Sequence, residues 1–117
     1  MSITNKLKAA LIQSELFWEN SDKNRSQFEN KINNLPSDIE LIVLPEMFTT
    51  GFTMNANKVF EEMNGKTINW MQKLAKKNQF AITGSIIIKE NDCYFNRLLF
   101  VHPSGKIDFY DKKHLLS

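Results

Sequence analysis

The order of apolar and polar residues predicts short strands that alternate with amphipathic helices. Residues 8–13 are typical of a short, mostly buried strand, and residues 41–44 form a continuous aliphatic run of the kind found in parallel strands covered on both faces. Between them, Ser21 or Asp22 can cap a helix. Its apolar face recurs with helical spacing at Phe28, Ile32 and Leu35. A strand–helix–strand unit implies a right-handed crossover and a parallel pair of strands.

The second half of the chain predicts one more helix and a group of strands. Residues 67–78 form an amphipathic helix with lysines near its C-terminus, where their positive charges interact favourably with the negative end of the helix dipole. Its apolar face is made of Ile68, Met71, Leu74 and Ala75. Residues 80–88 follow as a strand in which Gly84 marks a bulge or a close backbone approach. Residues 94–101 and 106–110 are two further strands joined by a proline-glycine turn. The predicted order is β-α-β, then α-β-β-β, which indicates an α/β fold.

Composition and charge then exclude several classes of protein. A chain of 117 residues can form one domain with a single core, and its net charge of +2 is spread in short groups, so no nucleic-acid partner is expected. No apolar run is long enough to cross a bilayer, and residues 1–6 lack the apolar core of a signal peptide. Cys93 is the single cysteine, which fits a reducing compartment. We expect a cytoplasmic protein without a membrane partner.

Glu46 is the first candidate for chemistry. It follows the buried strand 41–44, and ligands of open α/β sheets gather at the carboxyl ends of strands. Its apolar neighbours Leu44, Met47 and Phe48 predict partial desolvation, which raises the pKa of a carboxyl group toward that of a general base. The alternative is a solvated or helix-capping glutamate, as most charged residues face water. Phe48 itself is either the wall of a substrate pocket or a core residue.

The second candidate is a lysine in the segment 110–115, Tyr-Asp-Lys-Lys-His-Leu. In an extended segment alternate side chains point to opposite sides, so only one of Lys112 and Lys113 is expected to face a site. A lysine near a glutamate can stabilise an oxyanion, whereas the alternative is a solvated charge cluster after an edge strand. Spacing alone leaves the choice between the two lysines open.

Two separate motifs in this order resemble the nitrilase superfamily of carbon–nitrogen hydrolases. They are residues 44–48, Leu-Pro-Glu-Met-Phe, continued by residues 49–54, and far downstream residues 110–115. The likeness also covers residues 94–97 and the turn at 103–105, so it extends over nearly the whole chain. Within the superfamily, the chain is most similar to the bacterial omega-amidase-like branch.

This resemblance implies a fold and a set of roles. The fold is the N-terminal part of a layered α-β-β-α sandwich, so that residues 1–117 form a partial hydrolase domain. In the family the glutamate that matches Glu46 is the general base, and the lysine that matches Lys112 stabilises the tetrahedral intermediate. The family's nucleophile is a cysteine placed beyond the lysine motif, and this sequence ends before such a residue. We therefore expect that the chain by itself has no nucleophile and is inactive.

The remaining reactive side chains predict no further site. Cys93 follows a turn, with no adjacent base or helix N-terminus to lower the pKa of its thiol, so we interpret it as an ordinary hairpin residue. His102 and His114 lack the spacing of a zinc site. We expect neither a metal nor an organic cofactor.

The resemblance also implies a substrate class. Members of the omega-amidase-like branch hydrolyse short dicarboxylic acid monoamides such as 2-oxoglutaramate, through a thioester. One alternative keeps the superfamily but changes the substrate to nitriles or N-carbamoyl compounds. Another is a short, non-catalytic protein that retains the fold. In either case a partial layered sheet exposes apolar faces, so we expect a homo-oligomer.

Overall fold

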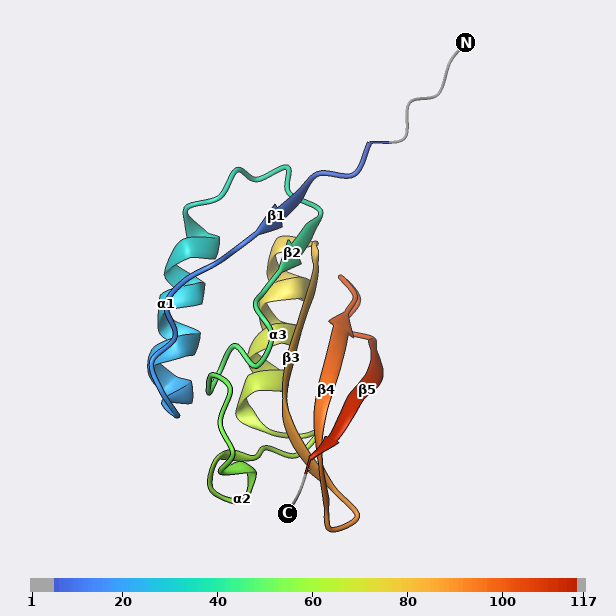
Figure 1. The fold of residues 1–117 in the computed structure, drawn as a ribbon. Coiled ribbons are helices and arrows are strands. Elements are labelled where there is room, and N and C mark those ends of the chain that lie inside the picture. Colours follow the sequence, from blue (N-terminus) through green and yellow to red (C-terminus); the bar gives the residue numbers. More distant parts are fainter. Residues whose placement is uncertain (1–5, 116–117) are drawn as a thin grey trace.

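A mixed five-stranded sheet forms the centre of the structure, a computed structural model that describes residues 6–115. The strands lie side by side in sequence order (Figure 1): β1 (Ala9–Leu11), β2 (Leu41–Val43), β3 (Ala81–Glu90), β4 (Cys93–Val101) and β5 (Ile107–Leu115). The pairs β1·β2 and β2·β3 are parallel, and β3·β4 and β4·β5 are antiparallel. The predicted α/β fold and its parallel first unit are confirmed.

Two long helices, α1 (Ser21–Asn33) and α3 (Lys66–Asn78), run alongside the sheet (Figure 1). Helix α3 begins one residue before its predicted start and ends at the predicted residue. This close agreement arises because the apolar face determines the position of the helix well. The cap of α1 was predicted wrongly: the side chain of Asn20 accepts the Lys23 N–H at 3.1 Å. An asparagine oxygen one residue earlier satisfies the free N–H groups of the first turn equally well.

Both helices pack on the same face of the sheet. Phe28 and Ile32 of α1 and Met71 of α3 belong to one buried cluster with Ile82 and Leu99 of the strands. Residues that alternate with these along the strands point to the opposite face, where neither α1 nor α3 lies. We call this second surface the open face.

The open face bears exposed apolar side chains. Leu11 of β1 is 73% exposed and Tyr110 of β5 is 67% exposed, and Leu98 of β4 lies directly opposite Tyr110. The prediction that the first strand is mostly buried is therefore wrong, because only Ala10 of β1 packs against the core. One end of the open face is covered by the loop after β2 and by the single turn α2 (Ala56–Val59).

Two further differences from the predicted elements concern the end of β5 and the short helix α2. Strand β5 extends to Leu115 instead of ending at Tyr110, since residues 111 and 113–115 still pair with β4. Helix α2 was not predicted, because four residues are too few to show a helical period. The expectations for residues 1–5 and 116–117 lie outside the described residues. In the part of the chain that is described, no helix combines the length and apolar character needed to span a bilayer.

Candidate active site

The loop after β2 holds Glu46 by tethering the next two residues to β3. The backbone N–H of Met47 donates to the Ser85 hydroxyl oxygen at 2.9 Å, and the N–H of Phe48 donates to the Ser85 carbonyl at 3.2 Å. Met47 has a φ of 50°, which L-residues other than glycine adopt rarely. This conformation sends Met47 to the small cluster on the open face and Phe48 to the main core. Glu46 is thus fixed at the point where the loop crosses the end of the sheet.

Phe48 anchors this loop from inside the core. Its side chain is fully buried and contacts Phe28 and Trp70, with ring centroids 5.8 and 6.0 Å away. Of the two predictions for Phe48, the structure supports core packing and does not support a pocket wall. Gly84 of β3 passes directly beneath the ring: a Cβ atom there would lie 2.9 Å from Phe48 Cδ1. The predicted close backbone approach at Gly84 is therefore present.

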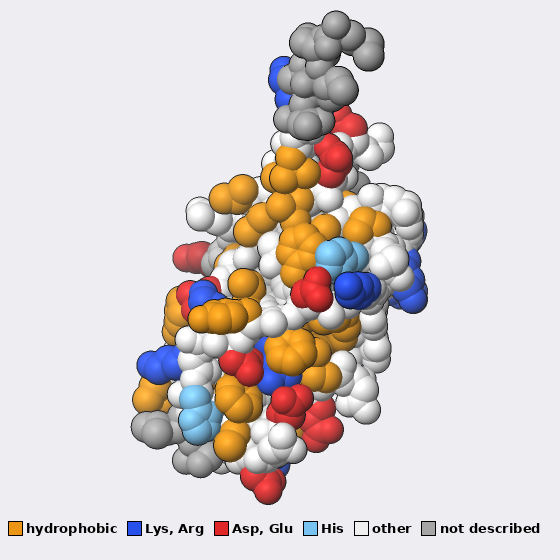
Figure 2. Space-filling model, turned by 90° about the vertical axis from the view of Figure 1, so that its right-hand side faces the viewer, with side chains coloured by type: hydrophobic (Ala, Val, Ile, Leu, Met, Phe, Trp, Pro, Cys, Tyr) orange, Lys and Arg blue, Asp and Glu red, His pale blue; other side chains and the backbone are white. Residues whose placement is uncertain are grey.

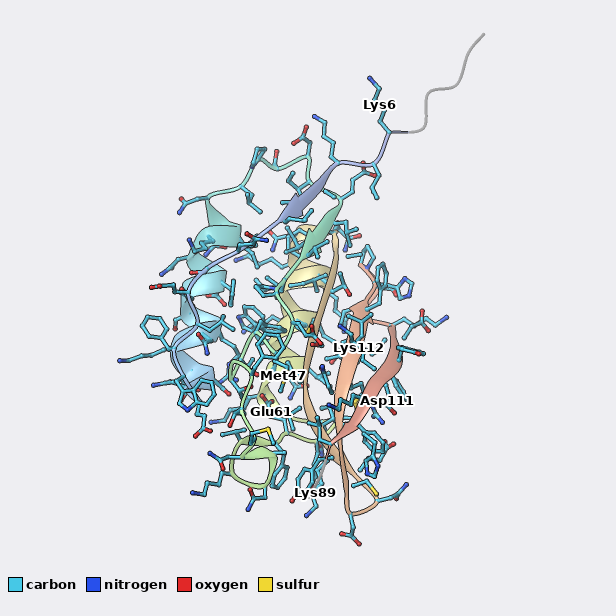
Figure 3. The ribbon with its side chains drawn as sticks, viewed as in Figure 1. Lys6, Met47, Glu61, Lys89, Asp111 and Lys112 are labelled. Atoms are coloured by element: carbon cyan, nitrogen blue, oxygen red, sulfur yellow. The ribbon has the colours of Figure 1, made fainter. Side chains whose placement is uncertain are left out.

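Glu46 and Lys112 meet across the sheet. Lys112 Nζ lies 3.0 Å from Glu46 Oε1, and Asn96 Nδ2 donates to the same oxygen at 2.8 Å. Figure 3 shows Lys112 on β5, across the sheet from the loop that carries Met47. Within residues 6–115, the second carboxylate oxygen, Oε2, receives no hydrogen bond. Glu46 therefore has one oxygen held by two donors and one oxygen free to accept a proton.

The electrostatics of this pair differ from the sequence-based prediction. The hydrogen bond from Lys112, and then that from Asn96, hold the pKa of Glu46 below its ordinary value of 4.5, and the opposing effect of burial is smaller. The predicted rise in pKa is wrong, because the side chain remains 37% exposed and two donors stabilise its charged form. Such an exposed ion pair contributes at most about 1 kcal/mol to stability. Glu46 is ionised at neutral pH, which is the form that accepts a proton.

A β-bulge decides how the two lysines lie on β5. Asp111 pairs with Arg97 and Lys113 pairs with Asn96, so Lys112 is an extra residue between two consecutive positions of β4. Paired residues share a face, so Lys113 projects to the same side as Asn96. The premise that the two lysines point to opposite sides is wrong, since it assumed an unbroken strand. The contact with Glu46 is nevertheless made by Lys112.

Two neighbours in β4 were missed by sequence reasoning. Asn96 is 6% exposed, and its Oδ1 is buried without a hydrogen-bond partner among the described residues. Arg97 is buried to the same degree as a core residue and pairs with Glu90 and Asp111. The overlooked signal in the sequence is a polar Asn-Arg step inside an otherwise apolar strand, because such residues are rarely buried without partners.

The other reactive side chains lie apart from this pair. Cys93 begins β4, three residues from Asn96, so regular alternation directs the two side chains to opposite faces. His102 pairs with Asp108 at 2.6 Å, and His114 packs against the ring of Phe95. No group of three or more metal-binding side chains occurs between residues 6 and 115.

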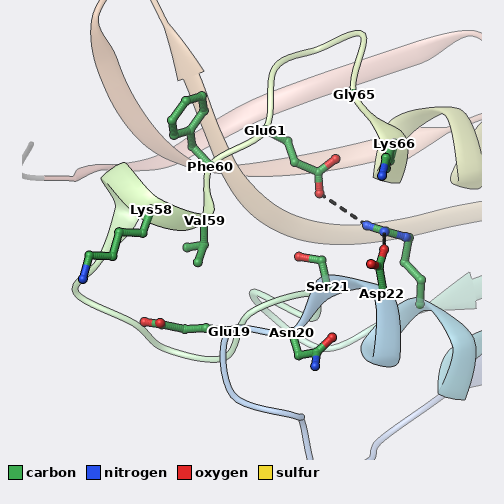
Figure 4. A pocket seen from close by; sticks show the side chains of 11 residues that line it. Glu19, Asn20, Ser21, Asp22, Lys58, Val59, Phe60, Glu61, Gly65 and Lys66 are labelled. Carbon is green, nitrogen blue, oxygen red and sulfur yellow. Dashed lines mark hydrogen bonds and ion pairs between the residues drawn. The ribbon is translucent and has the colours of Figure 1, made fainter.

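A separate groove, with a volume of about 560 Å³, lies between the start of α1 and the segment before α3 (Figure 4). Three of its charged groups pair with one another: Arg25 contacts Asp22 and lies 3.7 Å from Glu61. The hydroxyl and N–H of Thr67 also bind Glu61. Asp22 and Glu61 are thus held by Arg25 and Thr67, and we place no chemistry in this groove.

Comparisons with known proteins identify the family of the chain. Residues 8–117 match the model of the carbon-nitrogen hydrolase family. The omega-amidase YafV of Escherichia coli is 36% identical over 109 residues, which cover 93% of this chain and 42% of that protein. The omega-amidase YafV of Yersinia enterocolitica is 38% identical over 111 residues, with the same coverage. The crystal structure of XC1258 from Xanthomonas campestris, described as a CN-hydrolase superfamily protein, superimposes with a TM-score of 0.89 at 34% identity, covering 97% of this chain and 43% of that one. The chain thus spans about two fifths of the length of the relatives it matches.

Proposed function

The chain belongs to the carbon-nitrogen hydrolase family, and from this premise we propose that Glu46 and Lys112 are the general base and the oxyanion-stabilising cation of an amide-hydrolysing site. The observation that carries the proposal is the 3.0 Å contact between Lys112 Nζ and Glu46 Oε1, because the two residues come from motifs far apart in the sequence. Proximity of a carboxylate and an ammonium group at one end of a sheet is what this chemistry requires.

The proposed reaction begins with proton transfer to Glu46. The free Oε2 takes the proton of a cysteine thiol, and the thiolate attacks the amide carbon. Lys112 stabilises the negative charge that develops on the carbonyl oxygen. The C–N bond then breaks, ammonia leaves with the proton returned by Glu46, and a thioester remains. Water activated by Glu46 attacks the thioester, and the acid and the free thiol are released.

The arrangement of donors suits these roles. Lys112 and Asn96 both act on Oε1, so they orient the carboxylate without occupying the oxygen that takes the proton. A charged lysine is the form that stabilises an oxyanion.

The nucleophile is proposed to lie outside these 117 residues. Cys93 is a weak candidate, because alternation turns its side chain away from the face on which Asn96 meets Glu46. The matched relatives are more than twice as long as the match, which leaves room for a cysteine after the lysine motif. On this proposal the isolated chain does not hydrolyse amides.

The proposed substrates are short dicarboxylic acid monoamides, the substrate class that the resemblance to omega-amidases implies. The identity to two omega-amidases supports this class over nitriles and N-carbamoyl compounds, which use the same catalytic residues. Groups that bind the distal carboxylate of such a substrate would come in part from polypeptide beyond residue 117.

We further propose that polypeptide beyond residue 117 packs a second sheet onto the open face, so that residues 8–117 form part of a layered α-β-β-α domain. The exposed Leu11 and Tyr110 support this, because apolar side chains on a sheet face are normally covered. If the gene product ends at residue 117, a second copy of the chain would cover the face instead. The molecular mass of the complete gene product in solution distinguishes a covered monomer from an oligomer.

The direct test is ammonia release by the complete gene product that contains this chain. With 2-oxoglutaramate as substrate, Glu46→Gln is expected to abolish turnover, because an amide of the same shape cannot accept the proton. Glu15→Gln, at an exposed position, is the matched control and should retain full activity. Turnover that survives Glu46→Gln would contradict the proposal, whereas activity on a nitrile alone would correct the substrate class.

A further inference from the structure

The β-bulge in β5 lies at the position that carries Lys112. On one side of the bulge Asp111 is opposite Arg97, and on the other side Lys113 is opposite Asn96. Beyond it Leu115 is opposite Tyr94, and both pack near Met47 on the open face. A bulge is the usual device by which a strand redirects one side chain at a site.

Arg97 fixes the residue that precedes the bulge. Its Nε lies 2.6 Å from Asp111 Oδ1 and its Nη2 lies 3.0 Å from Asp111 Oδ2, so the contact is bidentate. The guanidinium also binds Glu90, with distances of 3.1 and 3.3 Å. Two bonds between planar groups restrain direction as well as distance. The backbone of Asp111 is therefore restrained where the strand departs from regular pairing.

The surroundings of Arg97 make this restraint stiff. Its side chain is 1% exposed, and its guanidinium carbon lies 4.1 Å from the ring centroid of Phe109 and 5.4 Å from that of Phe95. Figure 2 shows the side of the molecule on which β5 lies, where hydrophobic side chains alternate with acidic and basic groups. A buried guanidinium that loses a carboxylate partner is strongly disfavoured, so Arg97 holds Asp111 firmly.

We infer that Arg97 is a positioning residue: through its bidentate bond to Asp111 it anchors the bulge that directs Lys112 to Glu46. Consecutive residues of β4 thus hold the two members of the pair from opposite faces of the sheet. Asn96 binds Glu46 directly on the open face, and Arg97 acts on Lys112 through Asp111. The catalytic meaning of this inference rests on the proposed function, whereas the geometry it claims can be measured without activity.

The test compares variants of the bidentate contact between Arg97 and Asp111, called clamp variants, with a variant of a second ion pair in the same hairpin. Arg97→Lys keeps the charge but loses the bidentate geometry, and Asp111→Asn removes the carboxylate. The control is Asp108→Asn, which breaks the ion pair of β5 with His102 at the other end of the same hairpin. The two readouts, on the complete gene product, are the pKa of Glu46 from the NMR shift of its ¹³C-labelled carboxyl group, and kcat and KM for ammonia release.

Both clamp variants are expected to raise the pKa of Glu46, because Lys112 is the main cause of its depression and the only charged side chain bonded to it among the described residues. Simple loss of the Asp111 charge would lower that pKa, so the direction separates misplacement from electrostatics. We expect kcat to fall about 100-fold with little change in KM, as for a displaced catalytic group. Asp108→Asn should change neither quantity.

An unchanged or lowered pKa of Glu46 in the clamp variants, or an equal loss of kcat in Asp108→Asn, overturns the inference. If both clamp variants lose the native circular dichroism spectrum, Asp111→Glu replaces them, since it keeps the charge but lengthens the side chain by one methylene group. A folded Asp111→Glu protein with unchanged Glu46 pKa and kcat then overturns the inference. Full activity of a Lys112→Ala variant would refute the proposed function instead, and the NMR result would still decide the role of Arg97.

Discussion

Substitution of Gly84 by alanine tests how tightly the loop that carries Glu46 is packed. The new methyl group would lie 2.9 Å from Phe48 Cδ1 and 3.0 Å from Leu44 Cβ, closer than ordinary van der Waals contact. Phe48 cannot move aside easily, because it is fully buried between Phe28 and Trp70. Such overpacking costs about 1–3 kcal/mol. Alanine also lowers the conformational entropy of the unfolded chain, which stabilises the folded state by about 0.4–1 kcal/mol. The net expected destabilisation is therefore about 1–2 kcal/mol.

Urea unfolding followed by tryptophan fluorescence measures this change, and Trp70 reports on the ring of Phe48 directly. The double variant Gly84→Ala/Phe48→Leu is the control for the cause. Removing ring atoms makes room for the methyl group, so the two changes together should destabilise by about 1 kcal/mol less than their sum. A Gly84→Ala protein as stable as the wild type, with additive effects in the double variant, would refute the reasoning.

Two other predictions concern Ser85, which binds the loop that carries Glu46, and Lys112, which pairs with Glu46. Ser85→Ala leaves the buried N–H of Met47 without its acceptor and should destabilise by about 1–3 kcal/mol in urea unfolding, whereas Ser104→Ala, in an exposed turn, should be nearly neutral. Lys112→Met should raise the pKa of Glu46 in an NMR titration. A carboxyl group whose pKa is lower in the folded than in the unfolded state adds stability above the unfolded-state pKa, and this stability is lost as the pH falls through the folded-state pKa. The variant should therefore lose less stability than the wild type below about pH 4.5. An unchanged titration curve would argue against the ion pair.

The sequence predicted the parts of the fold that repeat a pattern over many residues. The helical period of residues 67–78 located α3 to within one residue, and the aliphatic run before Glu46 located β2. The resemblance to the nitrilase superfamily, drawn from two short motifs, is confirmed by the family match over residues 8–117. Local periodicity and motif order are properties of the chain itself, so they are readable without tertiary contacts.

The details of the candidate site depended on contacts between distant segments. Alternation along residues 110–115 could not reveal the bulge, because a register shift is set by pairing with β4 and not by the composition of β5. The pKa of Glu46 was predicted in the wrong direction for the same reason: its apolar neighbours in sequence were visible, whereas the donors Lys112 and Asn96 approach from other strands. Roles for Asn96 and Arg97 likewise required the structure.

The most direct test of the central claim compares the two adjacent lysines in one assay. In the complete gene product, Lys112→Ala should lower kcat for ammonia release from 2-oxoglutaramate by about 10²–10³-fold, the effect of removing one oxyanion donor. Lys113→Ala removes the same charge one residue away and should leave kcat nearly unchanged, since of the two lysines it is Lys112 that contacts Glu46. Equal losses in the two variants, or a larger loss in Lys113→Ala, would contradict the pairing of Glu46 with Lys112.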